Sequence, residues 1–142
     1  MLTPNEMKKT VLEDIGILIL RLGAGGMILT HGIPKIKRLF GDEPIQFMDF
    51  LGLGPIVSLS LAAFAEVLCA VLLIIGFKTR LATIPLIITM LTAALIAHSA
   101  DPFGRKELPL LYFVIFVAIL IFGGGKFSID GLKATKSSYY KL

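Results

Sequence analysis

The sequence predicts an all-α membrane protein that folds as one bundle of four transmembrane helices. Three observations lead to this fold class. Of the 142 residues, 56% are hydrophobic and 17% are charged, whereas soluble domains carry roughly 25% charged residues. The mean hydropathy is +0.86. Four apolar stretches each reach about 20 residues, the length that a helix needs to cross a hydrocarbon core about 30 Å thick.

Charge and cysteine content exclude several classes of function. The formal net charge is +4, but the basic residues are scattered between apolar spans and form no patch interleaved with aromatic residues. We therefore expect no nucleic acid partner. Cys69 is the only cysteine. A single thiol cannot form an internal disulfide, a redox pair or a thiolate metal cluster, so we expect no thiol redox chemistry within the chain and no metal centre.

The four spans belong to a single predicted domain, residues 1–142, and cover residues 15–34, 55–77, 81–100 and 108–125. They are predicted as helices rather than barrel strands because their apolar runs are continuous. The first span also begins like a cleavable signal peptide, but Arg21 interrupts it and the span continues to full membrane length. Between the first two spans, a short interfacial helix around residues 45–51 and a plain loop are equally consistent with the sequence.

The distribution of Lys and Arg predicts the orientation of the bundle. With four spans, both termini and the turn at residues 78–80 share one side of the membrane, together with eight basic residues, and five lie on the other side. Basic residues favour the cytoplasmic side. We therefore expect both termini in the cytoplasm and a multi-pass location in the cell membrane.

Two ionisable residues, Arg21 and Glu66, lie inside apolar spans, where each costs at least about 2.5 to 3.5 kcal/mol to insert. Small residues flank Glu66 at helical spacing, and Arg21 begins a stripe on the first span that comprises Arg21, Gly25, Ile28, Gly32 and Lys35. Small residues let helix backbones approach closely. We therefore expect the first two spans to pack along these surfaces and Arg21 to pair with Glu66. The alternative is that Arg21 reaches the cytoplasmic head groups.

A second polar group is expected near the outer membrane surface. His31 and His98 are predicted at the same depth, and Lys35, Glu107 and Tyr112 lie within a few turns of that level. We expect these five residues to line an outward-facing pocket that binds a quinone head group or a small anion. Two alternatives stay open. The histidines could be axial ligands of a haem b, which is the less favoured reading, or ordinary hydrated residues at the interface.

The last two spans are expected to serve mainly in packing. In the third span, Thr89, Ala93 and Ala97 form a row of small residues, which predicts a close helix contact. The fourth span has no charge in its interior and is predicted to face lipid.

Several residues of these spans carry a resemblance to the DoxX family of small four-helix membrane proteins. They are Arg21, Leu22, His31, Gly32, Lys35, Glu66, Gly76, Thr79, Arg80, His98 and the segment Gly-Gly-Lys-Phe-Ser-Ile-Asp from Gly124 to Asp130. Lys126 departs mildly from the family pattern, where arginine is as common. The resemblance covers nearly the whole chain, and its specificity lies in the order and spacing of the pieces. It implies a bacterial or archaeal cytoplasmic membrane and an association with respiratory or sulfur redox complexes.

Two classes of function follow. In the first, the protein is a membrane subunit of a quinone-linked or oxidative-stress redox complex, with little or no catalysis of its own. In the second, it is a noncatalytic module that binds and assembles a partner protein. A small proton-coupled transporter using Glu66 is a weaker alternative, because four helices leave little room for alternating access. The expected partners are membrane lipid and either a partner subunit or a second copy of the chain.

Overall fold

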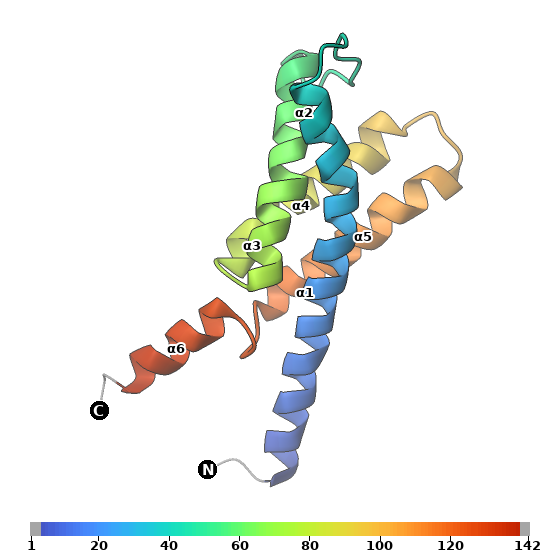
Figure 1. The fold of residues 1–142 in the computed structure, drawn as a ribbon. Coiled ribbons are helices and arrows are strands. Elements are labelled where there is room, and N and C mark those ends of the chain that lie inside the picture. Colours follow the sequence, from blue (N-terminus) through green and yellow to red (C-terminus); the bar gives the residue numbers. More distant parts are fainter. Residues whose placement is uncertain (1–3, 140–142) are drawn as a thin grey trace.

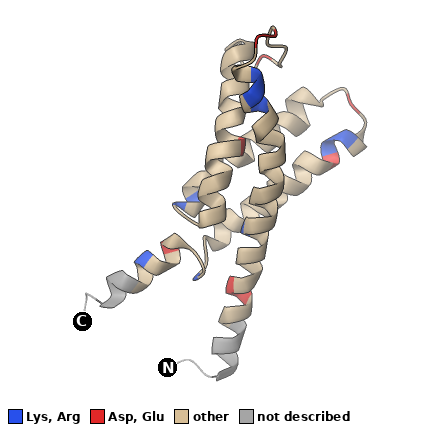
Figure 2. Ribbon diagram, viewed as in Figure 1, with Lys and Arg blue, Asp and Glu red and all other residues tan. Residues whose placement is uncertain are grey.

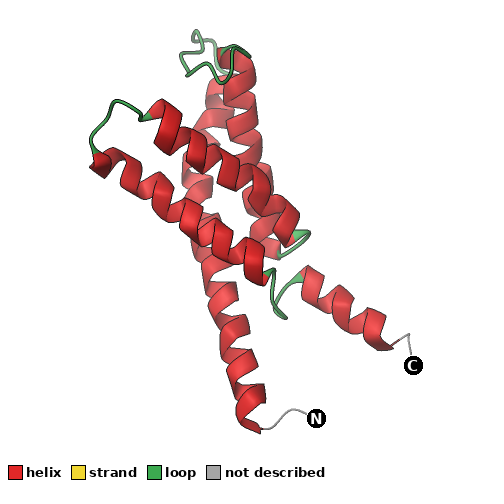
Figure 3. Ribbon diagram, turned by 180° about the vertical axis from the view of Figure 1, so that it is seen from behind, coloured by secondary structure: helices red, strands yellow, loops and turns green. Residues whose placement is uncertain are grey.

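The computed structural model describes residues 4–139, with the side chains of residues 10–135. In this part of the chain the secondary-structure elements are all helices, joined by loops, and there are no strands (Figure 3). Helix α1 covers Pro4–Leu39. A second continuous helical segment comprises α2 (Pro55–Ala63), the π-helical turn η1 (Phe64–Cys69) and α3 (Ala70–Ile75). A third comprises α4 (Thr79–Thr92) and the π-helical turn η2 (Ala93–Ala97). Helices α5 (Phe103–Phe122) and α6 (Ile129–Tyr139) follow.

The helices form two antiparallel pairs that lean apart at one end (Figure 1). Helix α1 packs along the whole α2–η1–α3 segment, and α4 packs along α5. Between the two pairs, α4 contacts η1 and α3 but diverges from α2. The start of α1, the turn between α3 and α4, and α6 lie at one end of the molecule, which we call the inner end. The loops at residues 40–54 and 98–102 lie at the opposite, outer end (Figure 1).

Two of the helical segments are long and apolar enough to cross a membrane: Pro55–Ile75, with a mean hydropathy of 2.4, and Thr79–Ala97, with 1.9. Charged residues gather toward the two ends of the molecule (Figure 2), and α5 carries Arg105, Lys106 and Glu107 in its first turns. The structure is all-helical, as predicted. The count of four membrane crossings and the cytoplasmic position of the termini stay predictions.

Local signals account for the ends of the segments. Pro55 begins α2 directly after Gly54, a position where the missing N–H of proline costs nothing. Gly76 ends α3 in the left-handed conformation with φ 71°, which glycine adopts without steric cost. Residues 45–51 form no helix, so the plain-loop interpretation of that segment is confirmed. Helix α6 was not predicted, because its mixed polar and apolar residues lack a membrane-length apolar run.

The core contradicts the prediction that the fourth span faces lipid. On α5, Tyr112, Phe116 and Ile119 are buried and belong to the central cluster with Ile28 of α1 and Leu86 of α4. Only the opposite face of α5 is exposed. The sequence could not show this division, because a helix that packs in lipid is apolar on both its buried and its lipid-facing sides.

Candidate functional site

A cavity of about 610 Å³ lies between the diverging helices, toward the outer end. One wall comes from α2 and η1, and the other from α4 and η2. Lys35 of α1 also lines the cavity. The loop between α1 and α2 closes the outer end with Gln46, Phe47, Met48 and Phe50. The walls are mainly apolar, and the polar lining residues are Lys35, Gln46, Ser58, Glu66, Thr89, Thr92 and His98.

Small side chains and two π-helical turns make room for this cavity. Thr89, Ala93 and Ala97 line it from one side, and Ala62 and Ala65 from the other. The row on the third span therefore borders a space, not the close helix contact that its small residues predicted. Both π-helical turns contribute lining residues, and such turns occur frequently at functional sites because they locally widen a helix.

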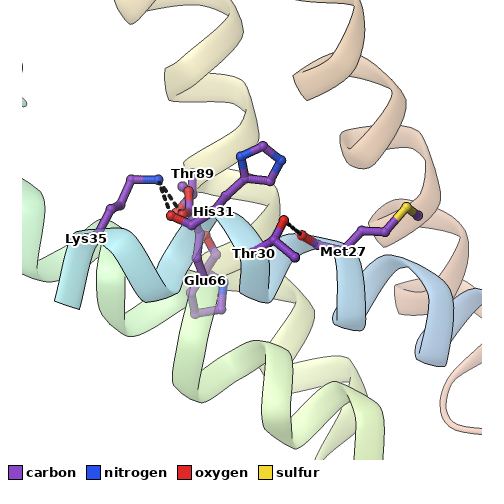
Figure 4. A network of polar contacts seen from close by, with 7 residues as sticks. Met27, Thr30, His31, Lys35, Glu66 and Thr89 are labelled. Atoms are coloured by element: carbon purple, nitrogen blue, oxygen red, sulfur yellow. Dashed lines mark hydrogen bonds and ion pairs between the residues drawn. The ribbon is translucent and has the colours of Figure 1, made fainter. Parts of the chain in front are cut away.

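Glu66 is the most buried charged residue of the cavity, with 4% of its surface exposed. Its carboxylate accepts a hydrogen bond and ion pair from Lys35 Nζ, which also lies 3.5 Å from the carbonyl oxygen of His31 (Figure 4). Side chains on a helix tilt toward its N-terminus, so Lys35 leads back along α1 toward the level of Glu66. The pair leaves neither charge alone in an apolar surrounding, where an unpaired ion is costly.

Thr89 of α4 lies beside this pair (Figure 4). Its hydroxyl donates to the carbonyl oxygen of Pro85 at 2.8 Å. The one hydroxyl proton is therefore used, and Thr89 offers its oxygen as an acceptor to anything that enters the cavity.

His98 lines the cavity after η2, where its Nδ1 lies 2.7 Å from the Asp101 carboxylate. The hydrogen bond with His98, followed by the charges of His98, Arg105 and Lys106, holds the pKa of Asp101 below its ordinary value. An ionised Asp101 accepts a hydrogen bond from a protonated Nδ1, which leaves Nε2 outside this contact. That nitrogen accepts a hydrogen bond when the ring is neutral and donates one when it is charged.

The structure brings together only part of the predicted pocket. Lys35 and His98 line the cavity, but His31, Glu107 and Tyr112 do not. His31 is exposed, and its ring packs edge-on against Tyr112 at 6.3 Å between centroids. Glu107 is exposed on α5. The two histidines do not share this cavity, as ligation of one haem between their rings would require. Depth along a helix can be counted from the sequence, but the direction of a side chain around the helix depends on the packing.

The predicted pairing of Arg21 with Glu66 is wrong, and so is the alternative that Arg21 reaches the head groups. Arg21 is 1% exposed and donates four hydrogen bonds to backbone carbonyls: Nε to Leu73 at 2.9 Å, Nη1 to Gly124 at 2.7 Å and Phe127 at 2.9 Å, and Nη2 to Ile74 at 2.7 Å. Leu73 and Ile74 are at the C-terminus of α3, where carbonyls lack helical partners and the helix dipole favours a cation.

The predicted packing of the first two spans is confirmed, but Lys35 takes the place of Arg21 beside Glu66. A Cβ atom on Gly32 would lie 2.8 Å from the carbonyl oxygen of Glu66, so Gly32 lies opposite Glu66. Lys35 lies one turn beyond Gly32 toward the outer end, and Arg21 lies three turns toward the inner end. A sequence signal for the correct pair was present, because Lys35 ends the same stripe as Arg21.

A second polar cluster at the inner end escaped the sequence analysis. The Asp130 carboxylate accepts hydrogen bonds from the backbone N–H groups of Lys78 at 2.9 Å and Thr79 at 2.8 Å, and from Thr79 Oγ1 at 2.7 Å. It thereby caps the N-terminus of α4. The Asp130 N–H donates to the carbonyl oxygen of Gly76 at 2.9 Å. Together with Arg21, these bonds attach the segment after α5 to the turn between α3 and α4.

Comparison with known proteins identifies the relatives of this chain. The sequence profile of the family described as DoxX matches residues 16–99. A protein of Bacillus subtilis (strain 168) named "Putative oxidoreductase CatD" is 27% identical over 118 residues, which are 82% of this chain and 86% of that protein. No solved structure matches. The profile match covers more than half of the sequence, includes Arg21, Gly32, Lys35, Glu66 and His98, and accompanies helices apolar enough to cross a membrane: the chain belongs to the DoxX family of membrane proteins.

Proposed function

We propose that this protein is a membrane component of a redox system and that its cavity binds the head group of a quinone. The observation that carries the proposal is the cavity itself. About 610 Å³ of mainly apolar space contains a few polar groups, including a buried ion pair. Small-molecule sites typically have volumes of roughly 300 to 1,000 Å³ and combine apolar walls with a few oriented polar groups. The relative named as an oxidoreductase supports the redox assignment.

The charges of the cavity favour a neutral ligand over a small anion. Lys35 is neutralised by Glu66, and His98 is bound to the carboxylate of Asp101. An anion would have to compete with Glu66 for the ammonium group and leave that carboxylate unpaired, which is costly in a buried position. A quinone ring is uncharged and offers carbonyl oxygens, which accept hydrogen bonds without displacing the ion pair.

The hydrogen-bonding groups suit both redox forms of such a ring. An ammonium group has three donors, and Glu66 uses one of those of Lys35, so a quinone oxygen can accept another. The reduced form carries hydroxyl groups, which can donate to the oxygens of Thr89 or Glu66. Reduction of a quinone to a quinol takes up two electrons and two protons. In this proposal a partner protein supplies the two electrons and the aqueous phase supplies the two protons, while the chain binds the ring and holds the polar groups around it.

The proposal includes the membrane topology. The chain crosses the cell membrane four times, with the inner end in the cytoplasm. The antiparallel order of the helical segments and the excess of basic residues toward the inner end support this arrangement.

The test is a binding titration with a benzoquinone that has no side chain. In purified protein, Lys35→Met and Glu66→Gln should each weaken binding of this probe about tenfold, the equivalent of roughly one charge-assisted hydrogen bond. Glu107→Gln is the matched control, because Glu107 is an exposed carboxylate away from the cavity and its substitution should leave the affinity unchanged.

A double variant separates binding from folding. Lys35→Met alone leaves the Glu66 carboxylate unpaired and is expected to destabilise the bundle, whereas Lys35→Met combined with Glu66→Gln removes both charges together. If the double variant folds and binds the probe as tightly as the unmodified protein does, the proposed site is wrong. The noncatalytic assembly module then becomes the better description of this chain.

A further inference from the structure

The side wall of the cavity contains apolar residues that are also exposed on the outside of the bundle. Leu61 and Phe64 on one wall are each 48% exposed, and Ile88 on the other is 52% exposed. A side chain that lines a cavity and is half exposed marks the rim of an opening. The cavity therefore opens sideways, between α2–η1 and α4.

The surface around this opening is apolar. On the same helices, exposed large side chains continue beyond the rim with Val57, Leu68, Val71, Leu81 and Ile84. These residues belong to Pro55–Ile75 and Thr79–Ala97, the two segments apolar enough to cross a membrane. The outer surface of a membrane-crossing helix lies in hydrocarbon. The opening therefore leads toward the acyl chains of the bilayer.

The outer end of the cavity is covered by a loop whose position is held by hydrogen bonds. Phe47, Met48 and Phe50 are part of the cavity lining. The Phe50 N–H donates to Ser58 Oγ at 2.9 Å, the Ser58 hydroxyl donates to the Gly54 carbonyl at 2.7 Å, and the Gly54 N–H donates to Asp49 Oδ1 at 2.8 Å. These bonds hold the loop to the start of α2, so apolar side chains separate the cavity from the aqueous side.

We infer that the opening between Phe64 and Ile88 is a lateral portal for the chain of a lipid-soluble ligand. The occupant is an amphiphile with an uncharged, hydrogen-bonding ring and a long hydrocarbon chain. Its ring lies at the Lys35–Glu66 pair, and its chain runs past the portal into the bilayer. This inference rests on the proposed function, and it specifies the class of quinone: one carried in the membrane rather than one dissolved in water.

The gradient of polarity inside the cavity gives the direction of the occupant. Lys35, Glu66 and Thr89 gather at one side, with contributions from three different helices (Figure 4). The portal residues Phe64 and Ile88 carry no polar groups. An amphiphile placed with its ring at the portal would leave the buried polar groups facing hydrocarbon, which is unfavourable. With the ring at the polar groups and the chain at the portal, each part of the amphiphile meets a surface of matching polarity.

Photolabelling locates the chain. The probe is a benzoquinone with a decyl chain that carries a diazirine near its end, added to the full-length protein in lipid nanodiscs and followed by mass spectrometry of the labelled peptides. We expect label on the peptides that contain Phe64 and Ile88, and we expect competition by the unlabelled decyl compound to remove it. Specific label on residues 46–50 would show that the chain leaves through the outer end and would overturn the portal.

A pair of variants one turn apart on α4 provides the second measurement. Ile88→Trp places a bulky ring in the portal, whereas Ile84→Trp makes the same change at an exposed isoleucine that does not line the cavity. Ile88→Trp should weaken binding of the decyl probe about tenfold, because the indole ring would occupy the path of the decyl chain. It should leave binding of the benzoquinone without a side chain unchanged. Ile84→Trp should change neither.

The outcomes separate the portal from the head-group site. Equal weakening of the decyl probe by Ile84→Trp and Ile88→Trp would contradict the portal. So would decyl binding that is unaffected by Ile88→Trp. In both cases, sensitivity of the unsubstituted ring to Lys35→Met and Glu66→Gln would still support the proposed function. If the unsubstituted ring does not respond to those two changes, the proposed function fails, and the portal inference fails with it.

Discussion

Two long cations on α1 have different roles because they meet different partners. Both side chains lead toward the N-terminus of the helix. From Lys35 this direction leads to a carboxylate. From Arg21 it leads to carbonyls at the end of α3 and in the segment that follows α5. The planar guanidinium, with five donors in fixed directions, suits several carbonyls at once, whereas an ammonium group suits one compact acceptor.

Replacing Arg21 is expected to destabilise the whole bundle. Arg21→Met removes four hydrogen bonds and leaves buried carbonyls without donors, which should lower the free energy of unfolding by about 3 kcal/mol or more. The stability of Arg21→Lys should lie between that of the unmodified protein and that of Arg21→Met, because lysine keeps the charge but loses the fork geometry of the guanidinium. The measurement is thermal denaturation in detergent, followed by circular dichroism.

Arg80→Met is the matched control for this prediction. Arg80 is also an arginine near the inner end, but it is exposed and makes one hydrogen bond, to the Ile121 carbonyl at 3.1 Å. Its loss should change stability by less than about 1 kcal/mol. Equal stability of Arg21→Met and Arg80→Met would show that the carbonyl contacts of Arg21 contribute little.

The sequence predicted which residues face one another more successfully than it predicted which charges pair. Gly25, Gly32 and the small neighbours of Glu66 correctly indicated the contact between the first two spans, because close backbone approach needs small residues at regular spacing. Pairing depends on the axial offset of two antiparallel helices. Arg21 and Lys35 lie about four turns apart on α1, and no local pattern specifies which of them meets Glu66.

The start of α4 depends on a residue that is distant in the sequence. Lys78, at its N-cap, has a left-handed conformation with φ 46°, which is uncommon for a residue with a side chain. Asp130 accepts hydrogen bonds from the N–H groups of Lys78 and Thr79 and thereby stabilises this turn. Burial raises the pKa of Asp130, but the hydrogen bonds from Thr79 and Lys78 and the charge of Lys133 outweigh burial and lower it below 3.8.

Asp130 should make stability depend on pH in acid. Because its pKa is lower in the folded state, its contribution is fully present above the ordinary value near 3.8 and is lost as the pH falls through the folded-state pKa. Asp130→Ala should lower the free energy of unfolding by about 1 to 2 kcal/mol at neutral pH, as for loss of a helix cap.

Melting temperatures measured from pH 3 to pH 7 check this prediction. The difference between the unmodified protein and the Asp130→Ala variant should shrink toward the acid end of the range, because protonation removes the same carboxylate charge that the substitution removes. A difference that stays constant over the whole range would mean that the charge of Asp130 is not what stabilises the turn.

The cavity was only partly predictable at the level of elements. The row of Thr89, Ala93 and Ala97 was visible in the sequence, but small residues on a helix face fit either a close contact or a space. The structure decides for a space because α4 diverges from α2. The two π-helical turns have no sequence signature in this chain, since their residues are ordinary helix formers.

At the scale of the whole molecule, the arrangement of the ends leads to a testable membrane orientation. In a Cys69→Ser background, Lys78→Cys lies at the inner end and Glu43→Cys lies in the outer loop, and both positions are exposed. In intact cells, a membrane-impermeant maleimide should label Glu43→Cys directly and should label Lys78→Cys only after the membrane is permeabilised. The reverse pattern would invert the orientation, and labelling of both positions from outside would contradict an odd number of crossings between them.

The closed inner half of the bundle determines how the cavity can work. Beneath the Lys35–Glu66 pair, the packed core that includes Leu73, Leu86 and Phe116 fills the space down to the carbonyl contacts of Arg21. The cavity is thus a blind-ended recess within the described part of the chain, not a conduit. A molecule that enters must leave through the same opening, so a bound ligand has to dissociate before another can enter. If the proposed function holds, exchange at a single entrance makes any head-group analogue a competitor for occupancy.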